Sequence, residues 1–376
     1  MKKITYVFGG GRLDKLSKEK QYAKDFYYGY HLVKNSNIFD TNILELYPFS
    51  NSEDSTSRVL LALDKLLNKL TFLQFHFHEI FKKNNYKEIK NSDVLIFSTD
   101  RLAISFFPIL KTKKNLKSIV IAMGLLKEHP KIKFYQKILR PFILYLFIKS
   151  VDKLIFLGKP EFDFAKNKYP KFVDKFEFVP FCIDLKFWSK DEFIENDSNY
   201  SNQILFVGND GNRNYEFVKS LPEYLKNFKF KFVTEQIVNS KNFSNLDLIN
   251  GNWSKGLLND IEMRRFYNES FLTILPIKNT IQPSGQSVTL QSLATGTPIL
   301  ISNFDGFWDS SLFADNKNIF FIDSFNVDEW KIKIEEIYQD QKKLQSVSKE
   351  GKKLVTDNYN LEIFSKKIIR IIEEII

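Results

Sequence analysis

The segment QPSGQSVTLQSLATGTPIL, residues 282–300, decides the fold class. Gly285 lies in a flexible turn, residues 287–294 are compatible with a helix, and Gly296 stands where that helix would end. The apolar residues 299–301 then enter a buried strand. A loop that delivers small residues to the start of a helix, followed at once by a strand, is typical of an α/β fold.

Short apolar runs on both sides of this segment predict further buried strands. The predicted strands are residues 4–8, 94–97, 119–122, 154–157, 204–207, 230–233, 272–275, 299–302 and 319–322. Helical or polar segments separate them, including a leucine-rich helical pattern from Arg58 to Leu73. This alternation predicts parallel sheets, and Pro180 marks a break between two such series. Residues 361–376 read as an amphipathic helix whose isoleucines need an apolar partner.

Length and composition agree with two soluble domains. The chain has 376 residues, more than one compact core usually supports. Its net charge of +10, from 55 basic and 45 acidic residues, favours anionic partners without naming one. The single Cys182 cannot form an internal disulfide, the first residues lack a secretory signal, and the longest apolar run, 142–148, is too short to span a bilayer. These features predict a cytoplasmic protein.

The start of the predicted helix in residues 282–300 is a candidate anion site. Free backbone N–H groups and the helix dipole attract an anion there, and Gly285 lets a phosphate approach the backbone closely. Gln291 follows Ser287 by one helical turn, so it can reach a ribose hydroxyl of the same ligand. The alternative is an ordinary turn between two elements, without a ligand.

Three further segments stand in order before this one. They are FVPFCIDLKFW at residues 178–188, ILFVGNDGNRNYEFVKSL at 204–221, and LLNDIEMRRFYNES at 257–270, where Asn259 and Glu262 have capping-box spacing. Together the four segments resemble those of the retaining GT-B nucleotide-sugar glycosyltransferases, the glycogen-synthase-like and mannosyltransferase-like superfamily (glycosyltransferase group 1, family 4-like).

The resemblance implies an α/β fold of the GT-B type, in which two Rossmann-like domains face one another across a cleft. It implies an acceptor-side domain at residues 1–184, a nucleotide-sugar-binding domain at 185–355, and a helix at 356–376 that crosses back to the N-terminal domain. It implies a hexosyltransferase that moves a sugar from a UDP- or GDP-sugar to a hydroxyl of a glycan or lipid-linked acceptor, with retention of configuration. Neither a metal nor a cofactor would be needed.

The sequence departs from the family's pattern at charged positions. Pro283 and Gln291 stand where relatives carry two glutamates, although Gln291 can still accept a hydrogen bond from ribose. Asn209 and Asn214 stand where relatives carry an arginine and a lysine of the phosphate loop. Arg213 is then the candidate cation for the departing diphosphate. The alternative is that Arg213 is an ordinary surface arginine. On this interpretation, Gln291→Leu would impair the donor site and leave stability nearly unchanged. The implied donor-binding residues are Gly208, Asn209, Arg213, Ser284, Gly285, Gln286, Ser287, Val288 and Gln291.

The motif YVFGGGR, residues 6–12, ends the first predicted strand in three consecutive glycines. This spacing does not match a dinucleotide fingerprint and argues against an NAD enzyme. The resemblance makes Gly10, Gly11 and Arg12 candidates for contact with an acceptor or a phosphate. A simple turn after a buried strand is the alternative.

The histidines offer neither a metal site nor an assigned catalytic group. His76 and His78 are two positions apart on the predicted helix, where their side chains would point about 200° apart and could not chelate one ion. Many family members carry a histidine near the transferred sugar, but the matching loop here has Met123 and Gly124, with His129 farther on. The catalytic residue of the N-terminal domain stays unassigned.

Two alternatives concern partners. Residues 131–149, KIKFYQKILRPFILYLFIK, fit either a peripheral helix at the inner face of an anionic membrane or a core helix kinked at Pro141. The missing glutamates and histidine leave a second class of function open, a non-catalytic GT-B-like binding or partner subunit. Nucleic acid is not an expected partner, because the sequence shows no recognised module or basic stripe.

Overall fold

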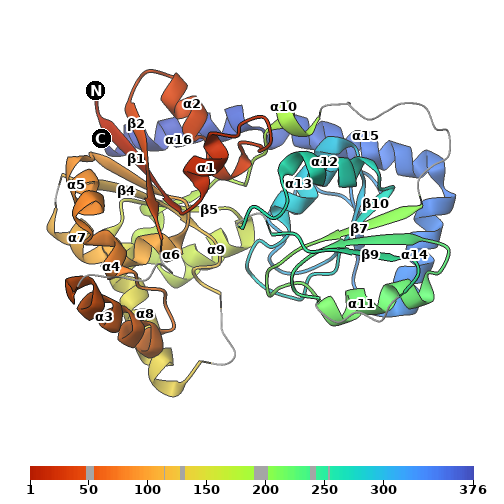
Figure 1. Cartoon of the computed structure of the whole chain (residues 1–376), viewed down its shortest axis with the longest axis horizontal. Coiled ribbons are helices and arrows are strands. Elements are labelled where there is room, and N and C mark those ends of the chain that lie inside the picture. Colours follow the sequence, from red (N-terminus) through yellow and green to blue (C-terminus); the bar gives the residue numbers. More distant parts are fainter. Residues whose placement is uncertain (48–54, 114, 128–131, 190–201, 238–242, 253–254) are drawn as a thin grey trace. The chain divides into compact units, whose positions relative to one another are not determined.

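The computed structural model describes residues 1–47, 55–113, 115–127, 132–189, 202–237, 243–252 and 255–376 (Figure 1). Residue contacts divide the chain into two compact α/β units. Unit 1 comprises Met1–Ser17, Phe26–Pro180 and Phe364–Ile376, and unit 2 comprises Lys18–Asp25 and Phe181–Ile363. Each unit therefore includes a short segment from a distant part of the sequence.

Unit 1 is built on a parallel sheet. Within the described residues its strand order is β2-β1-β3-β4-β5-β6. The strands are β1 (Lys3–Gly9), β2 (Asp40–Leu46), β3 (Val94–Phe97), β4 (Lys117–Ala122), β5 (Lys153–Phe156) and β6 (Phe176–Phe178). Strand β3 is buried at every position, as expected of a strand covered on both faces.

Helices connect these strands and bury their apolar sides against the sheet. They are α1 (Arg12–Leu16), α2 (Tyr30–Asn35), α3 (Ser55–Thr71), α4 (Phe77–Ile80), α5 (Lys83–Asn91), α6 (Asp100–Ala103), α7 (Phe107–Thr112), α8 (Phe134–Ser150) and α9 (Lys159–Lys168). Short 3-10 turns occur at Asp25–Tyr27, Ile104–Phe106 and Pro170–Lys175. The unit 1 core joins the sheet to α8 through Leu144, Phe147 and Ile148.

Unit 2 repeats the architecture, with strand order β12-β11-β10-β7-β8-β9 among the described residues and parallel pairing throughout. The strands are β7 (Gln203–Val207), β8 (Lys229–Val233), β9 (Leu246–Ile249), β10 (Leu272–Leu275), β11 (Ile299–Ser302) and β12 (Phe320–Ile322). The helices are α10 (Leu185–Trp188), α11 (Tyr215–Tyr224), α12 (Asp260–Asn268), α13 (Gln286–Thr295), α14 (Val327–Gln339) and α15 (Gln341–Asn358). The predicted capping box of α12 is present, because Asn259 and Glu262 exchange side-chain to backbone hydrogen bonds of 3.0 and 2.9 Å.

The final helix, α16 (Leu361–Ile375), contributes most of its length to unit 1. The ring of Phe364 lies 6.3 Å from that of Tyr28, and Glu374 forms a 3.2 Å ion pair with Lys153. Ile368 and Ile372 are fully buried. Ile371 is buried as well, so these isoleucines have apolar partners, whereas Ile376 is 50% exposed.

The structure confirms the nine predicted strands and corrects one other expectation. It adds β2, β6 and β9, which the sequence analysis did not predict. The long helix expected to carry His76 is wrong at that position: α3 ends at Thr71, Phe72 adopts a φ of +57°, and His76 precedes the separate helix α4. A positive φ cannot continue a right-handed helix, so Phe72 ends it.

The helices of the described residues were also compared with the length and apolar character that a membrane span requires. None of them meets both requirements.

Candidate functional site

The loops that follow β7 and β10 meet at the carboxyl edge of the unit 2 sheet. The N–H of Asn214 donates to the carbonyl of Pro276 at 2.8 Å, and the N–H of Lys278 donates to the carbonyl of Asn212 at 2.8 Å. Side chains strengthen this junction, because Asn212 Nδ2 donates to Ser284 Oγ at 2.6 Å. The two loops are therefore held together before any ligand arrives.

This junction lies at the topological switch point of the sheet. Strand β7 has β10 on one side and β8 on the other, so the connections on its two sides run in opposite directions. Parallel α/β sheets bind ligands outside the carboxyl ends of the strands at such a point. The predicted donor residues in loops 208–213 and 284–288 come from the two connections that flank it.

Arg213 is a buried cation in this junction. Its side chain is 4% exposed and pairs with the carboxylate of Asp210, while its Nε has no hydrogen-bond partner. A Cβ at position 208 would lie 2.6 Å from that Nε, so Gly208 gives the guanidinium room to pass. The structure therefore overturns the surface-arginine alternative.

The start of α13 is the second feature of the junction. Gly285 is its N-cap, with a φ of +82° and no side-chain cap. A Cβ on Gly285 would also lie 2.7 Å from Ile277 Cδ1, so only glycine fits this position. The N–H groups of the first helical turn and the helix dipole give this end of α13 a positive potential. The helix ends at Gly296, with a φ of +89°, as the sequence predicted.

Asn209 holds neighbouring loops together. Its Nδ2 donates to the carbonyl of Gly251 at 2.6 Å, and its Oδ1 accepts from the N–H of Glu235 at 2.6 Å and from Thr234 Oγ1 at 3.3 Å. It therefore links the loops that follow β7, β8 and β9. Asn214 is the N-cap of α11. The resemblance led us to look for cations at positions 209 and 214. In this chain both positions carry neutral asparagines, which form hydrogen bonds with backbone groups.

Gln291 lies within α13 and is buried. Its Nε2 donates to Asp25 Oδ2 at 2.9 Å, and its Oε1 accepts from the Tyr267 hydroxyl at 3.3 Å. Asp25 also accepts from the backbone N–H of Asp184 at 2.6 Å and from Trp188 Nε1 at 2.8 Å. A ribose contact by Gln291 would have to use the second lone pair of its Oε1 or the second hydrogen of its Nε2.

The sequence analysis did not single out Asp25, although its carboxyl group organises this buried network. Burial raises the pKa of Asp25 to about 8, while hydrogen bonds from Gln291 and from the backbone of Asp184 favour its ionised form. No local motif marks it, because its partners lie more than 150 positions along the chain. Only the fold brings these groups together.

The candidate residues of the first loop belong to unit 1. Gly11 adopts a φ of +89° before α1, and a Cβ on Gly10 would overlap the ring of Tyr47. The left-handed turn therefore requires glycine at position 11, whereas the packed ring of Tyr47 leaves no room for a Cβ at position 10. The guanidinium of Arg12 packs over the ring of Phe8, 5.9 Å from its centroid.

Two buried carboxyl groups hold the loop after β4, where the resemblance led us to look for a histidine. Asp100 Oδ1 accepts from the N–H of Met123 at 2.8 Å, and Glu161 accepts from the N–H groups of Gly124 and Leu126, each at 3.2 Å. Burial raises the pKa of Glu161 to about 7 and also raises that of Asp100. Sequence reasoning missed both residues, since neither is close to this loop along the chain.

The histidines take structural or undescribed places. His78 Nδ1 lies 2.7 Å from Asp64 Oδ2 inside unit 1, and burial lowers the pKa of His76 to about 4. His129 lies outside the described residues. Among the residues that the structure does describe, no group of three or more potential ligands is arranged to hold a metal ion.

Comparisons with known proteins identify the fold. No protein-family model and no curated protein matches the sequence. Sucrose-phosphate synthase from Thermosynechococcus elongatus is similar in structure, with a TM-score of 0.68 and 10% identity over 100% of this chain and 99% of that chain. A glycosyltransferase from Rickettsia africae gives 0.65 and 13% over 99% and 98% of the two chains. HepE from Anabaena, solved with UDP and glucose, gives 0.65 and 9% over 99% and 100%.

These similarities define the class of fold. The chain has the GT-B fold, with two Rossmann-like α/β units, as the sequence analysis predicted. The likeness extends over nearly the full length of this chain and of all three solved proteins. At identities of 13% or less it establishes the architecture, and function has to be argued from the site itself.

Proposed function

We propose that this protein is a glycosyltransferase that moves a hexosyl unit from a nucleotide-diphosphate sugar to a hydroxyl group of a glycan or lipid-linked acceptor. The observation that carries the proposal is the junction at the switch point of unit 2. There an uncapped helix N-terminus and a buried arginine lie on two loops that are hydrogen-bonded to each other. Both groups attract a diphosphate, and the solved HepE complexes contain UDP or UDP-glucose.

The chemistry requires stabilisation of a leaving diphosphate. The bond between the anomeric carbon and the diphosphate oxygen breaks, and a bond from the same carbon to the acceptor oxygen forms. The acceptor's proton goes to the departing phosphate, so no separate protein base is required. The start of α13 and Arg213 would oppose the charge that develops on the diphosphate. We propose retention of configuration and no need for a metal ion.

The competing proposal is a binding or partner subunit of the same fold. Two observations favour it: Arg213 is already paired with Asp210, and the amide of Gln291 already has two protein partners. A donor would have to compete with Asp210 for the guanidinium. The side chain of Asp210 is 46% exposed, however, so it can move into solvent when a phosphate binds Arg213.

Binding and turnover separate these proposals. Thermal-shift measurements with UDP, GDP, ADP and their sugars should show stabilisation by one nucleotide, because a ligand of the native state raises its stability. The best donor is then incubated with candidate acceptors, with and without EDTA, and the anomeric configuration of the product is read by NMR. Nucleotide binding without transfer or donor hydrolysis would favour the binding subunit. Absence of stabilisation by any nucleotide would refute the transferase and favour a partner subunit that binds no donor.

Arg213→Ala is the matched test of the site, with Arg265→Ala as its control. Arg265 is a half-exposed arginine of α12, paired with Glu269 at 3.4 Å. Only the Arg213 variant should weaken nucleotide binding. We also propose a cytoplasmic location, which the buried and unpaired Cys182 supports.

A further inference from the structure

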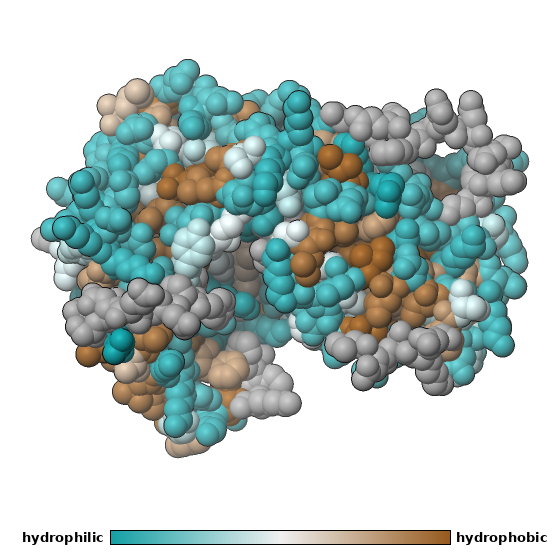
Figure 2. Space-filling view, viewed as in Figure 1, coloured by the Kyte–Doolittle hydropathy of each residue, from teal (hydrophilic) through white to brown (hydrophobic). Residues whose placement is uncertain are grey.

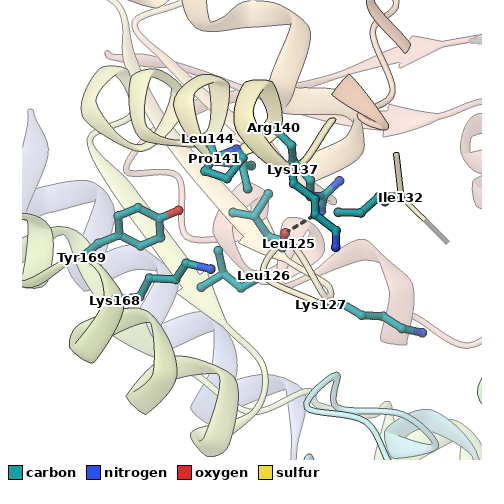
Figure 3. Close-up of a pocket in the computed structure, with 10 residues that line it drawn as sticks. All are labelled: Leu125, Leu126, Lys127, Ile132, Lys137, Arg140, Pro141, Leu144, Lys168 and Tyr169. Carbon is teal, nitrogen blue, oxygen red and sulfur yellow. Dashed lines mark hydrogen bonds between the residues drawn. The ribbon is translucent and has the colours of Figure 1, made fainter. Parts of the chain in front are cut away.

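Unit 1 contains a cavity whose lining residues have no part in the donor junction described above. It lies between the loop after β4, helix α8 and the end of α9, with a volume of about 460 Å³ (Figure 3). This is the size of a small-molecule pocket and is larger than a phosphate group needs. Its lining therefore indicates what kind of molecule would fill it.

The charged lining residues all have the same sign. They are Lys127, Lys137, Arg140 and Lys168, and among the residues that the structure describes no acidic one lines the cavity. Arg140 is only 8% exposed, and its guanidinium donates to the carbonyls of Phe72 at 2.8 Å and Leu125 at 3.1 Å. Among the residues that the structure describes, no carboxylate forms an ion pair with Arg140, although the buried Asp100 acts on it electrostatically from a longer distance. A buried cation whose hydrogen-bond partners are neutral favours a bound anion.

Tyr169 supplies an independent sign of a ligand. Its side chain is 9% exposed, and its hydroxyl is buried without a hydrogen-bond partner. Figure 3 shows this hydroxyl directed into the cavity from the end of α9. Buried polar groups in native proteins nearly always have a partner, so an unpaired O–H facing a cationic cavity calls for an acceptor there. A phosphate oxygen would be a strong one.

The rest of the lining is apolar. It consists of Leu125, Leu126, Ile132, Pro141 and Leu144. Phe134, Ile138 and Phe142 of α8 follow one another at four-residue spacing and are 78%, 58% and 59% exposed. Because successive residues of a helix are about 100° apart, this exposed stripe borders the stripe of α8 that lines the cavity. Figure 2 shows apolar side chains gathered over the region of α3 and α8.

We propose that this cavity binds the phosphate group of an amphiphile. The phosphate accepts a hydrogen bond from Tyr169 and faces the lysines and Arg140. The adjoining apolar part of the molecule lies on the leucines and continues along the exposed stripe of α8. A phosphate explains the cations and the unpaired hydroxyl, and an apolar chain explains the excess volume and the exposed phenylalanines. The site belongs to unit 1 and the donor junction to unit 2, so each can be tested by its own binding measurement.

Short-chain lipids that stay monomeric in water are suitable probes. Isothermal titration of the full-length protein with dihexanoyl phosphatidic acid should show binding. Inorganic phosphate lacks the apolar chain, and in dihexanoyl phosphatidylcholine the choline ammonium offsets the charge of the phosphodiester, so each should bind at least tenfold more weakly. Equal binding of inorganic phosphate would overturn the amphiphile, equal binding of phosphatidylcholine would overturn the cationic site, and no binding of phosphatidic acid would overturn the proposal.

Variants locate the binding within the chain. Tyr169→Phe removes the unpaired hydroxyl, so it should leave the melting temperature of the free protein unchanged or higher and weaken phosphatidic acid binding about tenfold. Lys137→Gln should also weaken binding, whereas Lys149→Gln, an exposed lysine of α8 outside the cavity, should not. Wild-type affinity in both the Tyr169 and Lys137 variants, with their melting temperatures retained, would refute the assignment. Nucleotide-induced thermal shifts report separately on the donor site.

Discussion

Replacing Gln291 by leucine tests whether the amide within α13 is a structural group or a ligand contact. Leucine keeps the apolar volume and the helix propensity, and it removes both hydrogen bonds of the amide. Asp25 loses a donor at 2.9 Å, and the hydroxyl of Tyr267 loses an acceptor at 3.3 Å. The sequence alone led us to expect little change in stability. The buried network predicts a substantial loss.

The magnitude follows from the two broken contacts. A hydrogen bond to a charged group contributes about 1.5–3 kcal/mol, and a stranded neutral hydroxyl costs about 1–3 kcal/mol. We expect roughly 3 kcal/mol, near the lower end of the sum, because Asp25, with a pKa of about 8, can take up a proton instead of remaining as an unpaired charge. For a unit of this size, that free energy corresponds to a fall in melting temperature of roughly 6–12 °C.

Circular dichroism melts and nucleotide titrations, carried out on the same preparations, measure both effects. Ser287→Ala, on the same helix, is the control that should melt like the wild type. Gln291→Glu places a second carboxyl group beside Asp25, so its destabilisation should grow as the pH rises and both groups ionise. Our reasoning would be refuted if Gln291→Leu melted like the wild type. A selective loss of nucleotide binding would then assign the amide to the ribose.

Four further predictions follow from the structure. Arg213→Ala should weaken nucleotide-diphosphate binding by about 1.5–3 kcal/mol in isothermal titration. Gly285→Ala should lower both stability and nucleotide binding, because alanine is strained at a φ of +82° and its Cβ would meet Ile277. The stability of unit 1 should fall as the pH rises from 4.5 to about 7, because a raised pKa means that folded Glu161 binds more protons than the unfolded chain; Glu161→Gln should flatten this dependence. Deleting residues 361–376 should destabilise unit 1, since each buried isoleucine contributes about 1.5–3 kcal/mol.

Each of these predictions has an outcome that contradicts it. Unchanged nucleotide affinity in folded Arg213→Ala would remove this arginine from the donor site. A Gly285→Ala variant that binds and melts normally would show that the turn can relax. A stability profile of the Glu161→Gln variant parallel to that of the wild type would assign the pH dependence to other groups. A truncated protein with normal melting and turnover would show that α16 is dispensable.

The central strands were predictable from sequence because burial on both faces requires continuous apolar runs. The missed strands β2, β6 and β9 all lie at sheet edges, where one side has no neighbouring strand. Strand β2 reads DTNILEL and β9 reads LDLI, so polar residues interrupt both. Edge strands tolerate such residues, and their apolar pattern is therefore weak.

The candidate site was predictable where it depends on local backbone chemistry. Gly285 and Gly296 could be placed at the two ends of α13 because their conformations follow from the turn that each must form. The partners of Gln291 could not be predicted, because Asp25 and Tyr267 come from distant segments with no motif of their own. The resemblance implied that the Gln291 amide contacts the donor ribose, whereas in the structure it forms hydrogen bonds with Asp25 and Tyr267.

The C-terminal helix belongs to the unit formed by the N-terminal half of the chain, and this has a consequence for biosynthesis. Unit 1 includes Phe364–Ile376, so its first 180 residues leave the ribosome long before their last partner exists. At about 5–20 residues per second, the wait is roughly 10–40 s. During that time an apolar surface that α16 will cover is open to chaperones and to other nascent chains. A gene fragment cut after Pro180 would leave that surface uncovered permanently, so soluble expression of the first unit should depend on supplying the last helix in the same polypeptide or as a separate peptide.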